Sequence, residues 1–518
     1  MTREETLRAI LNSPGPWDVI AIGGGATGLG AAVDAAARGY RALLLEQSDF
    51  AKGTSSRSTK LIHGGIRYLR QGRVSLVRES LRERGLLLQN APHLVQARSF
   101  VIPAYSWWEG PFYAAGLKLY DSLAGQLGLG PSRILSREDT LRSLPTLRPE
   151  KLRGGVLYLD GQFDDARLAL TLVHTLTDLG GLALNYARVE SLLKKEGRVS
   201  GVRVRDLETG QEFQVHARAV INASGVFVDT IRRMDHPDAP STITLSQGSH
   251  IVLDRSFLPG ECALMIPKTD DGRVLFAIPW HDRVVVGTTD NPASETALEP
   301  HPAPGEIEYL LHHAARYLVR TPSRRDILST FAGLRPLASS RKSPSTSEIS
   351  RAQALEVSAS GLVTVTGGKW TTYRSMGETA VTAAAHTAGM EPRPSRTRDL
   401  RLHAGTTEPE APSHWRCYGG DAAKIRALVK EHPNGSERLH LNLPYQICEV
   451  VWAVRQEMAR TVEDVLARRT RALILDARAS VEIAAKVAQL VGTELGRDPR
   501  WIEEQTSSFI QLAKGYLP

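Results

Sequence analysis

The sequence predicts a multidomain α/β protein, α+β overall, with a discontinuous doubly wound domain, a mixed-sheet domain and a helical C-terminal domain. A glycine-rich loop joins a buried strand to a small-residue helix near the start of the chain, and a second strand–glycine–helix unit lies at 361–389. Amphipathic helical patterns follow in the C-terminal region. At 518 residues the chain is too long for one hydrophobic core, so two or three domains are expected.

Composition and charge narrow the classes of protein to consider. The net charge of +8 comes from scattered arginines without long Lys/Arg runs, which argues against nucleic acid and favours a phosphorylated metabolite or an acidic membrane surface. The three cysteines are far apart, so we expect no disulfide framework, no metal site and a reducing, cytoplasmic setting. The sequence contains no signal peptide pattern and no apolar stretch long enough to span a bilayer.

The first motif lies between Asp18 and Glu46. A predicted strand at 18–22 leads into Gly23-x-Gly25-x-x-Gly28, an alanine-rich helix and a second strand that ends in Glu46. The first glycine permits a tight turn, the second lets backbone N–H groups approach a pyrophosphate, and the third lets the helix pack on the strand. Glu46 can accept a hydrogen bond from a ribose 2′-OH. This Rossmann-like motif alone leaves NAD and FAD open.

The second glycine unit favours FAD. A predicted strand from Leu362 to Thr366 leads into Gly367-Gly368 and a helix that opens near Thr371. An NAD domain has no need of such a unit, whereas FAD is longer and a second helix N-terminus can face its flavin. A strand that ends in Ala223-Ser224-Gly225 offers a third place where the backbone can approach a cofactor.

The segment TSSRSTKLIHGGIRYLRQG, at 54–72, combines hydroxyls, glycines and cations without an acid. Such a composition suits a loop between an anionic cofactor and an anionic substrate. Together with IPWHDRVVVGTTD, FAGLRPL, GGKWTTYRSMGETAV and ARTVEDVLARRTR, this segment resembles the FAD-dependent glycerol-3-phosphate dehydrogenases. The resemblance runs from Trp17 to about Leu495, and its last motif lies in the helical C-terminal domain typical of that family.

The resemblance and the order of the motifs imply the domain organisation. The FAD-binding domain is expected at 15–95, 150–230 and 330–390, and the substrate domain at 96–149 and 231–329. A stretch rich in proline, threonine and charge then leads to the helical domain at 400–518.

The resemblance also implies which residues contact FAD. They are expected in the glycine loop, at the end of the second strand, in the segment after it and at three later positions. These cofactor-binding residues are Gly23, Gly25, Ala26, Thr27, Gly28, Glu46, Gln47, Thr54, Ser55, Lys60, Leu61, His63, Val189, Gly225 and Gly368.

Six further residues are implied at the substrate end. Those that bind substrate are Arg67, Tyr68 and Arg351, and those assigned to catalysis are His250, Arg335 and Lys369. His250 is the candidate base, with an ordered water or a hydroxyl that deprotonates beside Arg335 as alternatives. Arg335 is expected to grip substrate through its planar guanidinium, and Lys369 to favour negative charge on the flavin or to bind phosphate. The pair Asp164-Asp165 is interpreted as a helix N-cap.

The implied reaction is oxidation of sn-glycerol 3-phosphate to dihydroxyacetone phosphate, with hydride transfer from C2 to flavin N5 and electrons passed to a membrane quinone. Three alternatives remain. A glycerol-3-phosphate oxidase would use oxygen and make hydrogen peroxide. An amine-oxidase-like flavoenzyme would need fewer cations at its site. A non-catalytic flavin-binding module would use the C-terminal helices as a partner surface.

The apolar and aromatic stretch from Trp107 to Tyr120 has two interpretations. Tryptophan and tyrosine with a lysine suit a membrane interface, but a helix packed into the substrate domain would have the same composition. The first interpretation predicts a cytoplasmic protein attached peripherally to the inner face of the cytoplasmic membrane. A homodimer is also left open.

Overall fold

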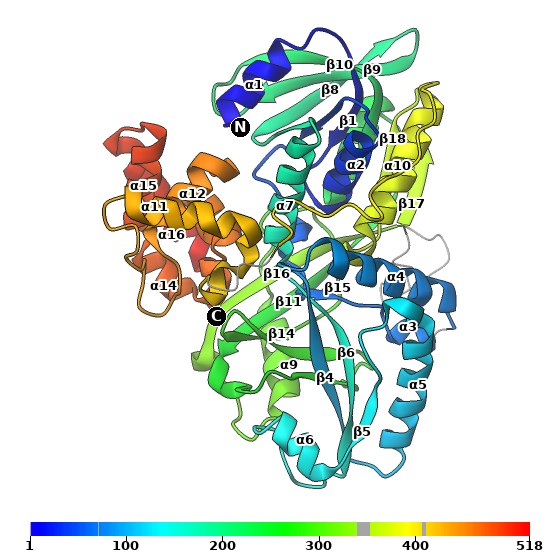
Figure 1. The fold of residues 1–518 in the computed structure, drawn as a ribbon, viewed down its shortest axis with the longest axis vertical. Coiled ribbons are helices and arrows are strands. Elements are labelled where there is room, and N and C mark those ends of the chain that lie inside the picture. Colours follow the sequence, from blue (N-terminus) through cyan, green and yellow to red (C-terminus); the bar gives the residue numbers. More distant parts are fainter. Residues whose placement is uncertain (1, 71, 339–352, 407–410) are drawn as a thin grey trace.

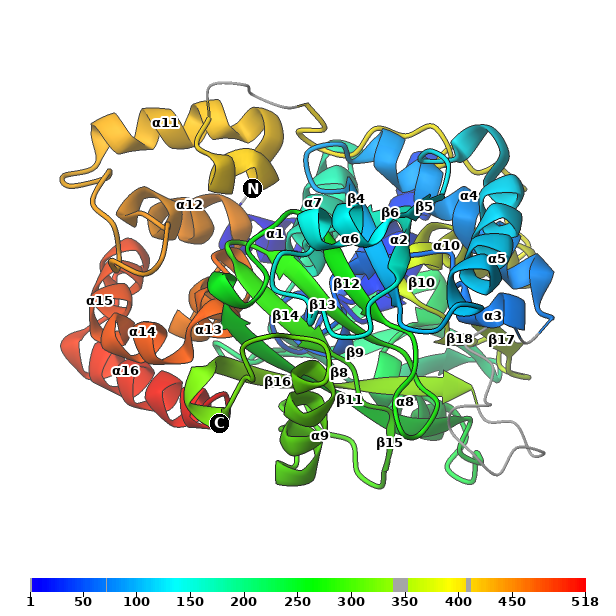
Figure 2. The ribbon, with the colours of Figure 1, turned by 90° about the horizontal axis from the view of Figure 1, so that it is seen from below.

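The computed structural model describes residues 2–70, 72–338, 353–406 and 411–518. Two sheets and a helical region make up the molecule (Figure 1). The helices from α11 (Ala422–Glu431) to α16 (Pro499–Lys514) lie to one side of both sheets (Figure 2). The predicted fold class is confirmed.

The first sheet carries the glycine motifs. Its strand order is β17-β18-β10-β1-β2-β7, with β8 and β9 attached through β10. The central strands are parallel and buried, which accounts for their nearly continuous apolar sequence. Their bounds are β1 Trp17–Ile22, β2 Ala42–Leu45, β7 Leu182–Leu184, β8 Ala187–Lys195, β9 Arg198–Asp206, β10 Glu212–Asn222, β17 Gln353–Val357 and β18 Val363–Gly367.

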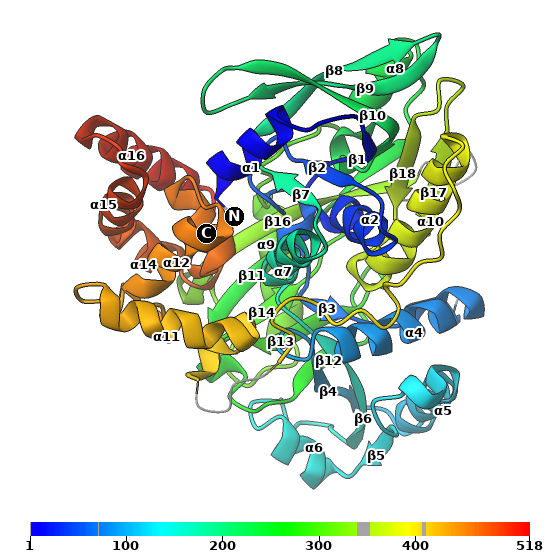
Figure 3. The ribbon, with the colours of Figure 1, turned by 45° about the horizontal axis from the view of Figure 1, so that its top comes forward.

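Helices α2 (Ala26–Ala37), α7 (Asp165–Asp178) and α10 (Tyr373–Thr387) share one apolar core with the first sheet (Figure 3). Helices α2 and α10 pack closely against each other at Gly30 and Gly377. A Cβ added to Gly377 would lie 2.5 Å from the carbonyl oxygen of Gly30, so only glycine fits at this contact. On the other face, α1 (Arg3–Leu11) and α8 (Val228–Asp235) pack with β8, β9 and β10.

The second sheet is mixed. Its order is β15-β11-β14-β13-β12-β4-β6-β3, with β16 paired to β11 and β5 to β6, and β4 and β12 run parallel within an otherwise antiparallel arrangement. The strand bounds are β3 Leu61–Ile62, β4 Gln96–Ala104, β5 Arg133–Leu135, β6 Gly154–Gln162, β11 Ile243–Asp254, β12 Ala263–Ile266, β13 Leu275–Trp280, β14 Arg283–Gly287, β15 Asn291–Ala293 and β16 Ile327–Ala338.

Further helices accompany the second sheet and share apolar clusters with its strands. They are α3 Arg67–Arg70, α4 Val74–Asn90, α5 Glu109–Ala124, α6 Arg137–Ser143 and α9 Pro304–Ala315. The domain boundaries inferred from the sequence stay a prediction. Strand pairing places β3, β6 and β16 in the second sheet. However, β3, β6 and most of β16 fall within the segments assigned to the FAD-binding domain.

The helical region packs against the second sheet. Its core includes Val252, Trp280, Val285 and Phe331 from the strands. Its other helices are α12 Ile447–Glu457, a π-helical turn at Asp464–Arg469, α13 Ala472–Leu475, α14 Ala477–Glu482 and α15 Ala484–Leu495. Within the parts of the chain that the structure describes, no helix has the length and apolar character needed to cross a membrane.

Candidate active site

A cavity of about 550 Å³ lies between the two sheets. Its walls come from the loops at the carboxyl ends of the first-sheet strands and from β11 and β16 of the second sheet. Seventeen of the residues predicted at the site line it: Gly23, Gly25, Ala26, Thr27, Glu46, Gln47, Thr54, Ser55, Leu61, His63, Tyr68, Val189, Gly225, His250, Arg335, Gly368 and Lys369.

The first glycine loop has the geometry that the motif requires. Gly23 has φ of 113°, and a Cβ added there would lie 2.6 Å from the carbonyl oxygen of Ala223. A Cβ on Gly28 would overlap the carbonyl oxygen of Gly23, so this glycine sets the contact between helix and strand. Gly25, the N-cap of α2, lines the cavity, so the N-terminal amides of this helix can attract an anion there.

Glu46 is fixed at one end of the cavity. Its carboxylate accepts hydrogen bonds from the backbone N–H groups of Gly24 at 2.6 Å and Ser48 at 2.8 Å. Burial raises the pKa of Glu46 above its ordinary value, against the lowering effect of these two donors. Gln47 and Val189 line the same end. An oriented acid beside the glycine turn fits the ribose of a dinucleotide.

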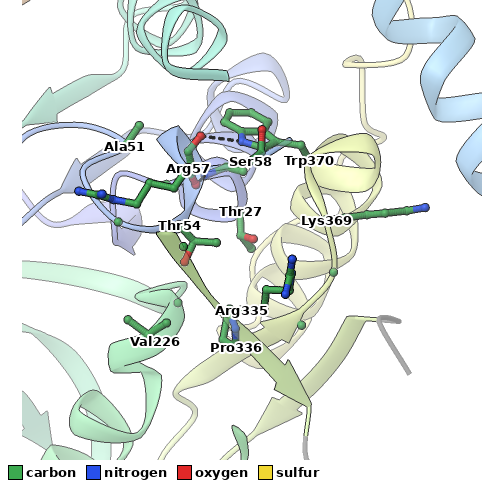
Figure 4. A pocket seen from close by; sticks show the side chains of 18 of the residues that line it. Thr27, Ala51, Thr54, Arg57, Ser58, Val226, Arg335, Pro336, Lys369 and Trp370 are labelled. Atoms are coloured by element: carbon green, nitrogen blue, oxygen red, sulfur yellow. Dashed lines mark hydrogen bonds between the residues drawn. The ribbon is translucent and has the colours of Figure 1, made fainter. Parts of the chain in front are cut away.

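A second backbone approach lies at the start of α10. Gly367 and Gly368 have φ of 72° and 79° and line the cavity. Beside them, the indole N–H of Trp370 donates to the carbonyl of Ser55 at 2.8 Å, which ties the second glycine unit to the segment after β2 (Figure 4). Two glycine turns and two helix N-termini at one cavity therefore fit FAD.

Arg335 lies on β16 and its side chain enters the cavity (Figure 4). Its guanidinium is 3.3 Å from the Asp290 carboxylate, 3.1 Å from Thr288 Oγ1 and 3.2 Å from the Thr289 carbonyl oxygen. Gly248 provides the space, because a Cβ there would overlap the guanidinium. The cation is thus held in one orientation at the cavity wall.

His250 lies on β11, close to Arg335. Its Nε2 is 2.9 Å from Thr59 Oγ1, and its ring stacks on Phe331 with centroids 4.5 Å apart. Nδ1 is buried and has no hydrogen-bond partner among the described residues. Burial, and then the charges of Lys60 and Arg335, hold the pKa of His250 well below its ordinary value. The imidazole is therefore neutral, which is the form that accepts a proton.

Lys369 follows the second glycine turn. Its ammonium lies 3.5 Å from the His63 carbonyl oxygen and 5.5 Å from the centre of the Tyr68 ring. Tyr68 belongs to α3 and is buried. The structure thus brings a cation from the second glycine unit to the loop that precedes the short helix α3.

Four predicted residues are not among the described residues that line the cavity. Gly28 packs α2 on its strand, and the Lys60 ammonium is buried, 2.7 Å from Asp165 Oδ2. Arg67 begins α3, but its side chain is not among those described. Arg351 lies outside the described residues. These assignments stay predictions.

Sequence reasoning missed several groups that the structure places at the site. Arg57 and Thr59 line the cavity, and Asp290 pairs with Arg335. Asp290 belongs to the motif IPWHDRVVVGTTD, which contributes to the family resemblance but contains no predicted site residue. The expected N-cap is confirmed, because Asp164 accepts a hydrogen bond from the N–H of Arg167.

Comparisons with known proteins identify the family of this chain. Residues 18–383 match the family described as FAD dependent oxidoreductase, and residues 367–502 match the C-terminal domain of alpha-glycerophosphate oxidase. The mitochondrial glycerol-3-phosphate dehydrogenase of Homo sapiens is 40% identical over 558 residues, which cover 99% of this chain and 76% of that protein. The mitochondrial enzyme of Arabidopsis thaliana is 38% identical, with 97% and 86% covered.

Solved structures give the same result. The glycerol-3-phosphate dehydrogenase from Bacillus halodurans, complexed with FAD, has a TM-score of 0.82 and 29% identity, and covers 100% of this chain and 98% of that chain. The L-alpha-glycerophosphate oxidase from Mycoplasma pneumoniae, with FAD bound, has a TM-score of 0.58 at 17% identity over 75% of this chain, a likeness of fold alone. The predictions of an enzyme and of FAD are confirmed. The chain belongs to the family of FAD-dependent glycerol-3-phosphate dehydrogenases.

Proposed function

We propose that this enzyme oxidises sn-glycerol 3-phosphate to dihydroxyacetone phosphate and delivers the electrons to a membrane quinone. The observation that carries the proposal is the meeting of Arg335, His250 and Lys369 in one cavity with the residues that fit FAD. A phosphorylated secondary alcohol needs cations for its dianion and a neutral base for its hydroxyl. The cavity wall offers both.

Each side chain has a definite task in this proposal. The fixed guanidinium of Arg335 and the ammonium of Lys369 bind the anionic substrate and orient its C2. The neutral His250 takes the C2 hydroxyl proton, directly or through Thr59, whose hydroxyl it contacts and which also lines the cavity. The alternatives are an ordered water as the base, and deprotonation of the C2 hydroxyl beside Arg335 without a protein base. When bound, FAD supplies N5 as the hydride acceptor and the route of the electrons to quinone.

Other acceptors and substrates have less support. The named relatives at 38–40% identity are dehydrogenases, whereas the oxidase structure is only 17% identical. An amine substrate would not explain two cations, Arg335 and Lys369, in the wall of the cavity. A non-catalytic module does not agree with membership of an oxidoreductase family.

A quinone acceptor requires contact with a membrane, and α5 offers a surface for it. Trp107 precedes this helix and is 78% exposed, and Trp108 is its N-cap and is 49% exposed. Within the helix, Phe112 is 51% exposed and Leu119 is 50% exposed. The opposite side of α5 is buried in the substrate region. Both interpretations of this stretch therefore have support. We propose peripheral attachment to the inner face of the cytoplasmic membrane through the aromatic side, while a homodimer stays a prediction.

Anaerobic reduction tests the proposal. The purified enzyme is mixed with sn-glycerol 3-phosphate without oxygen, and the flavin absorbance is followed. We expect bleaching, rapid reoxidation by a soluble quinone and slow reoxidation by oxygen. Rapid reoxidation by oxygen with stoichiometric peroxide would instead establish the oxidase, and no bleaching would reject this substrate.

A further inference from the structure

The segment from Asp49 to Lys60, here called the cofactor segment, forms one wall of the cavity. Residues 51–55 and 57–59 line it. The segment contains only the short 3₁₀ turn Thr54–Ser56. Because such a segment has few backbone hydrogen bonds of its own, its conformation depends on the side chains that hold it.

The first of these contacts is at Asp49. This carboxylate is fully buried and pairs with both Arg468 and Arg469. Burial would raise the pKa of Asp49, but the two guanidinium groups hold it below its ordinary value. Both arginines belong to the π-helical turn Asp464–Arg469, a rare element that is frequent at functional sites.

The second contact is at Lys52, which lines the cavity. Its ammonium lies 2.7 Å from Glu463, one residue before the π-helical turn. Glu463 also pairs with Arg468 at 2.7 Å. Although burial opposes it, Arg468 and Lys52 lower the pKa of Glu463 to about 2, so this carboxylate stays charged.

The third contact is at Arg57, which also lines the cavity. Its guanidinium donates to Tyr516 Oη at 2.7 Å and to Glu299 at 2.6 Å. The Tyr516 hydroxyl donates to the same Glu299 oxygen at 2.6 Å. Tyr516 follows α16 and is buried, so the far end of the helical region reaches the cofactor segment.

The fourth contact is at the backbone carbonyl of Ser56, toward the other end of the segment. Arg471 donates to the Ser56 carbonyl at 2.9 Å and to Asp165 at 2.9 Å. Lys60 donates to the same carbonyl at 2.8 Å and to the same carboxylate at 2.7 Å. The cofactor segment is thus held from Asp49 to Arg57 by side chains from 463–516, and Lys60 is held by Asp165.

We propose that the helical C-terminal domain holds the cofactor segment in the conformation that retains FAD. Of the residues that the structure describes, those that line the cavity all precede Tyr373. The helical domain therefore acts through the segment and not by contact with the cofactor. Since coupling between two binding events is reciprocal, bound FAD also strengthens the docking of this domain.

Two conservative substitutions test this coupling. Glu463→Gln removes the charge that pairs with Lys52 and Arg468, and Tyr516→Phe removes one hydroxyl while it keeps the buried ring. The matched controls are Tyr418→Phe and Arg455→Gln, which remove contacts to Glu449 and Glu494 within the same domain. Apo protein is titrated with FAD, and hydrogen exchange of the peptide at 49–60 is measured with and without FAD.

We expect the double variant, which carries Glu463→Gln and Tyr516→Phe, to have a Kd for FAD about 10- to 100-fold higher than that of the wild type. The reason is that hydrogen bonds to charged groups are lost. Exchange at 49–60 should be faster than in the wild type, and both controls should match the wild type. Equal Kd and equal exchange in the double variant and the controls would overturn the proposal. If the double apo variant does not fold, Tyr516→Phe alone decides, and an unchanged Kd in that variant rejects the coupling.

Discussion

The guanidinium of Arg335 and the carboxylate of Asp290 lie 3.3 Å apart inside the cavity. The same guanidinium reaches the Thr288 hydroxyl and the Thr289 carbonyl, so a single loop holds it on several sides. A planar cation with several donors can keep these contacts and still offer N–H groups to a substrate oxyanion. An ammonium on a flexible stem cannot do both.

We therefore expect Arg335→Lys to lower kcat/KM for sn-glycerol 3-phosphate by about 10- to 100-fold, the cost of one hydrogen bond to a charged group. Arg335→Ala should lower it further, because the loop loses its cation. FAD content should stay near wild type in both variants. Steady-state kinetics with an artificial acceptor, beside flavin stoichiometry, measure this. Arg73→Ala is the control, and full kcat/KM in Arg335→Lys would reject the assignment.

His250 should be required for turnover and insensitive to mild acid. His250→Asn is expected to lower kcat by about 100-fold or more, the contribution of a positioned general base, with FAD retained. Burial keeps the pKa of His250 well below 6.5, so the neutral ring persists as the pH falls through this value. The pH profile of wild-type kcat/KM should therefore show no fall near pH 6.5 that can be assigned to His250. A fall that is present in the wild type and absent in His250→Asn would contradict this expectation. An unaltered kcat in the variant would favour water or substrate deprotonation beside Arg335.

The aromatic side of α5 should bind anionic lipid. Phe112→Ser should reduce recovery with anionic vesicles in a sedimentation assay. Leu441→Ser, at a residue that is 90% exposed on the helical domain, should not. Basic residues near an anionic leaflet contribute about 1 kcal/mol each, so high salt should weaken binding of the wild type. Equal recovery of all three proteins with neutral and anionic vesicles contradicts this role of α5.

His403 links the helical domain to α7 in a pH-dependent manner. It bridges Asp421 at 2.8 Å and Asp178 at 2.6 Å, and stacks on His174 with centroids 4.8 Å apart. Hydrogen bonding to Asp421, and then to Asp178, raises the pKa of His403 above 6.5. A raised folded-state pKa gives stability that is complete below the unfolded value and is lost as the pH rises through the folded value.

We thus expect His403→Asn to destabilise the protein by about 1.5 kcal/mol near pH 6, the contribution of a hydrogen bond to a charged group, and by less near pH 8.5. Urea titrations of both proteins at the two pH values measure the difference. A pH-independent difference would mean that His403 acts by packing alone.

The features that were predicted correctly depend on residues that lie close together in the sequence. The Gly23–Gly28 turn, the Gly367-Gly368 turn and the Asp164 cap each depend on neighbours within a few residues, so spacing alone identifies them. Pairs such as Arg335 with Asp290, or Asp49 with Arg468, join distant segments. No local pattern specifies such a partner, although their charged residues were visible in the sequence.

The contact between Gly30 and Gly377 has a consequence for the order of assembly during synthesis. Helix α2 lies near the start of the chain, whereas α10 and its partner strand β18 come much later. A nascent chain that stops before residue 363 lacks one of the two helix N-termini at the cavity. Loading of FAD is therefore expected to wait until most of the chain has left the ribosome, and until then α10 cannot cover the apolar residues of α2 with which it shares a core.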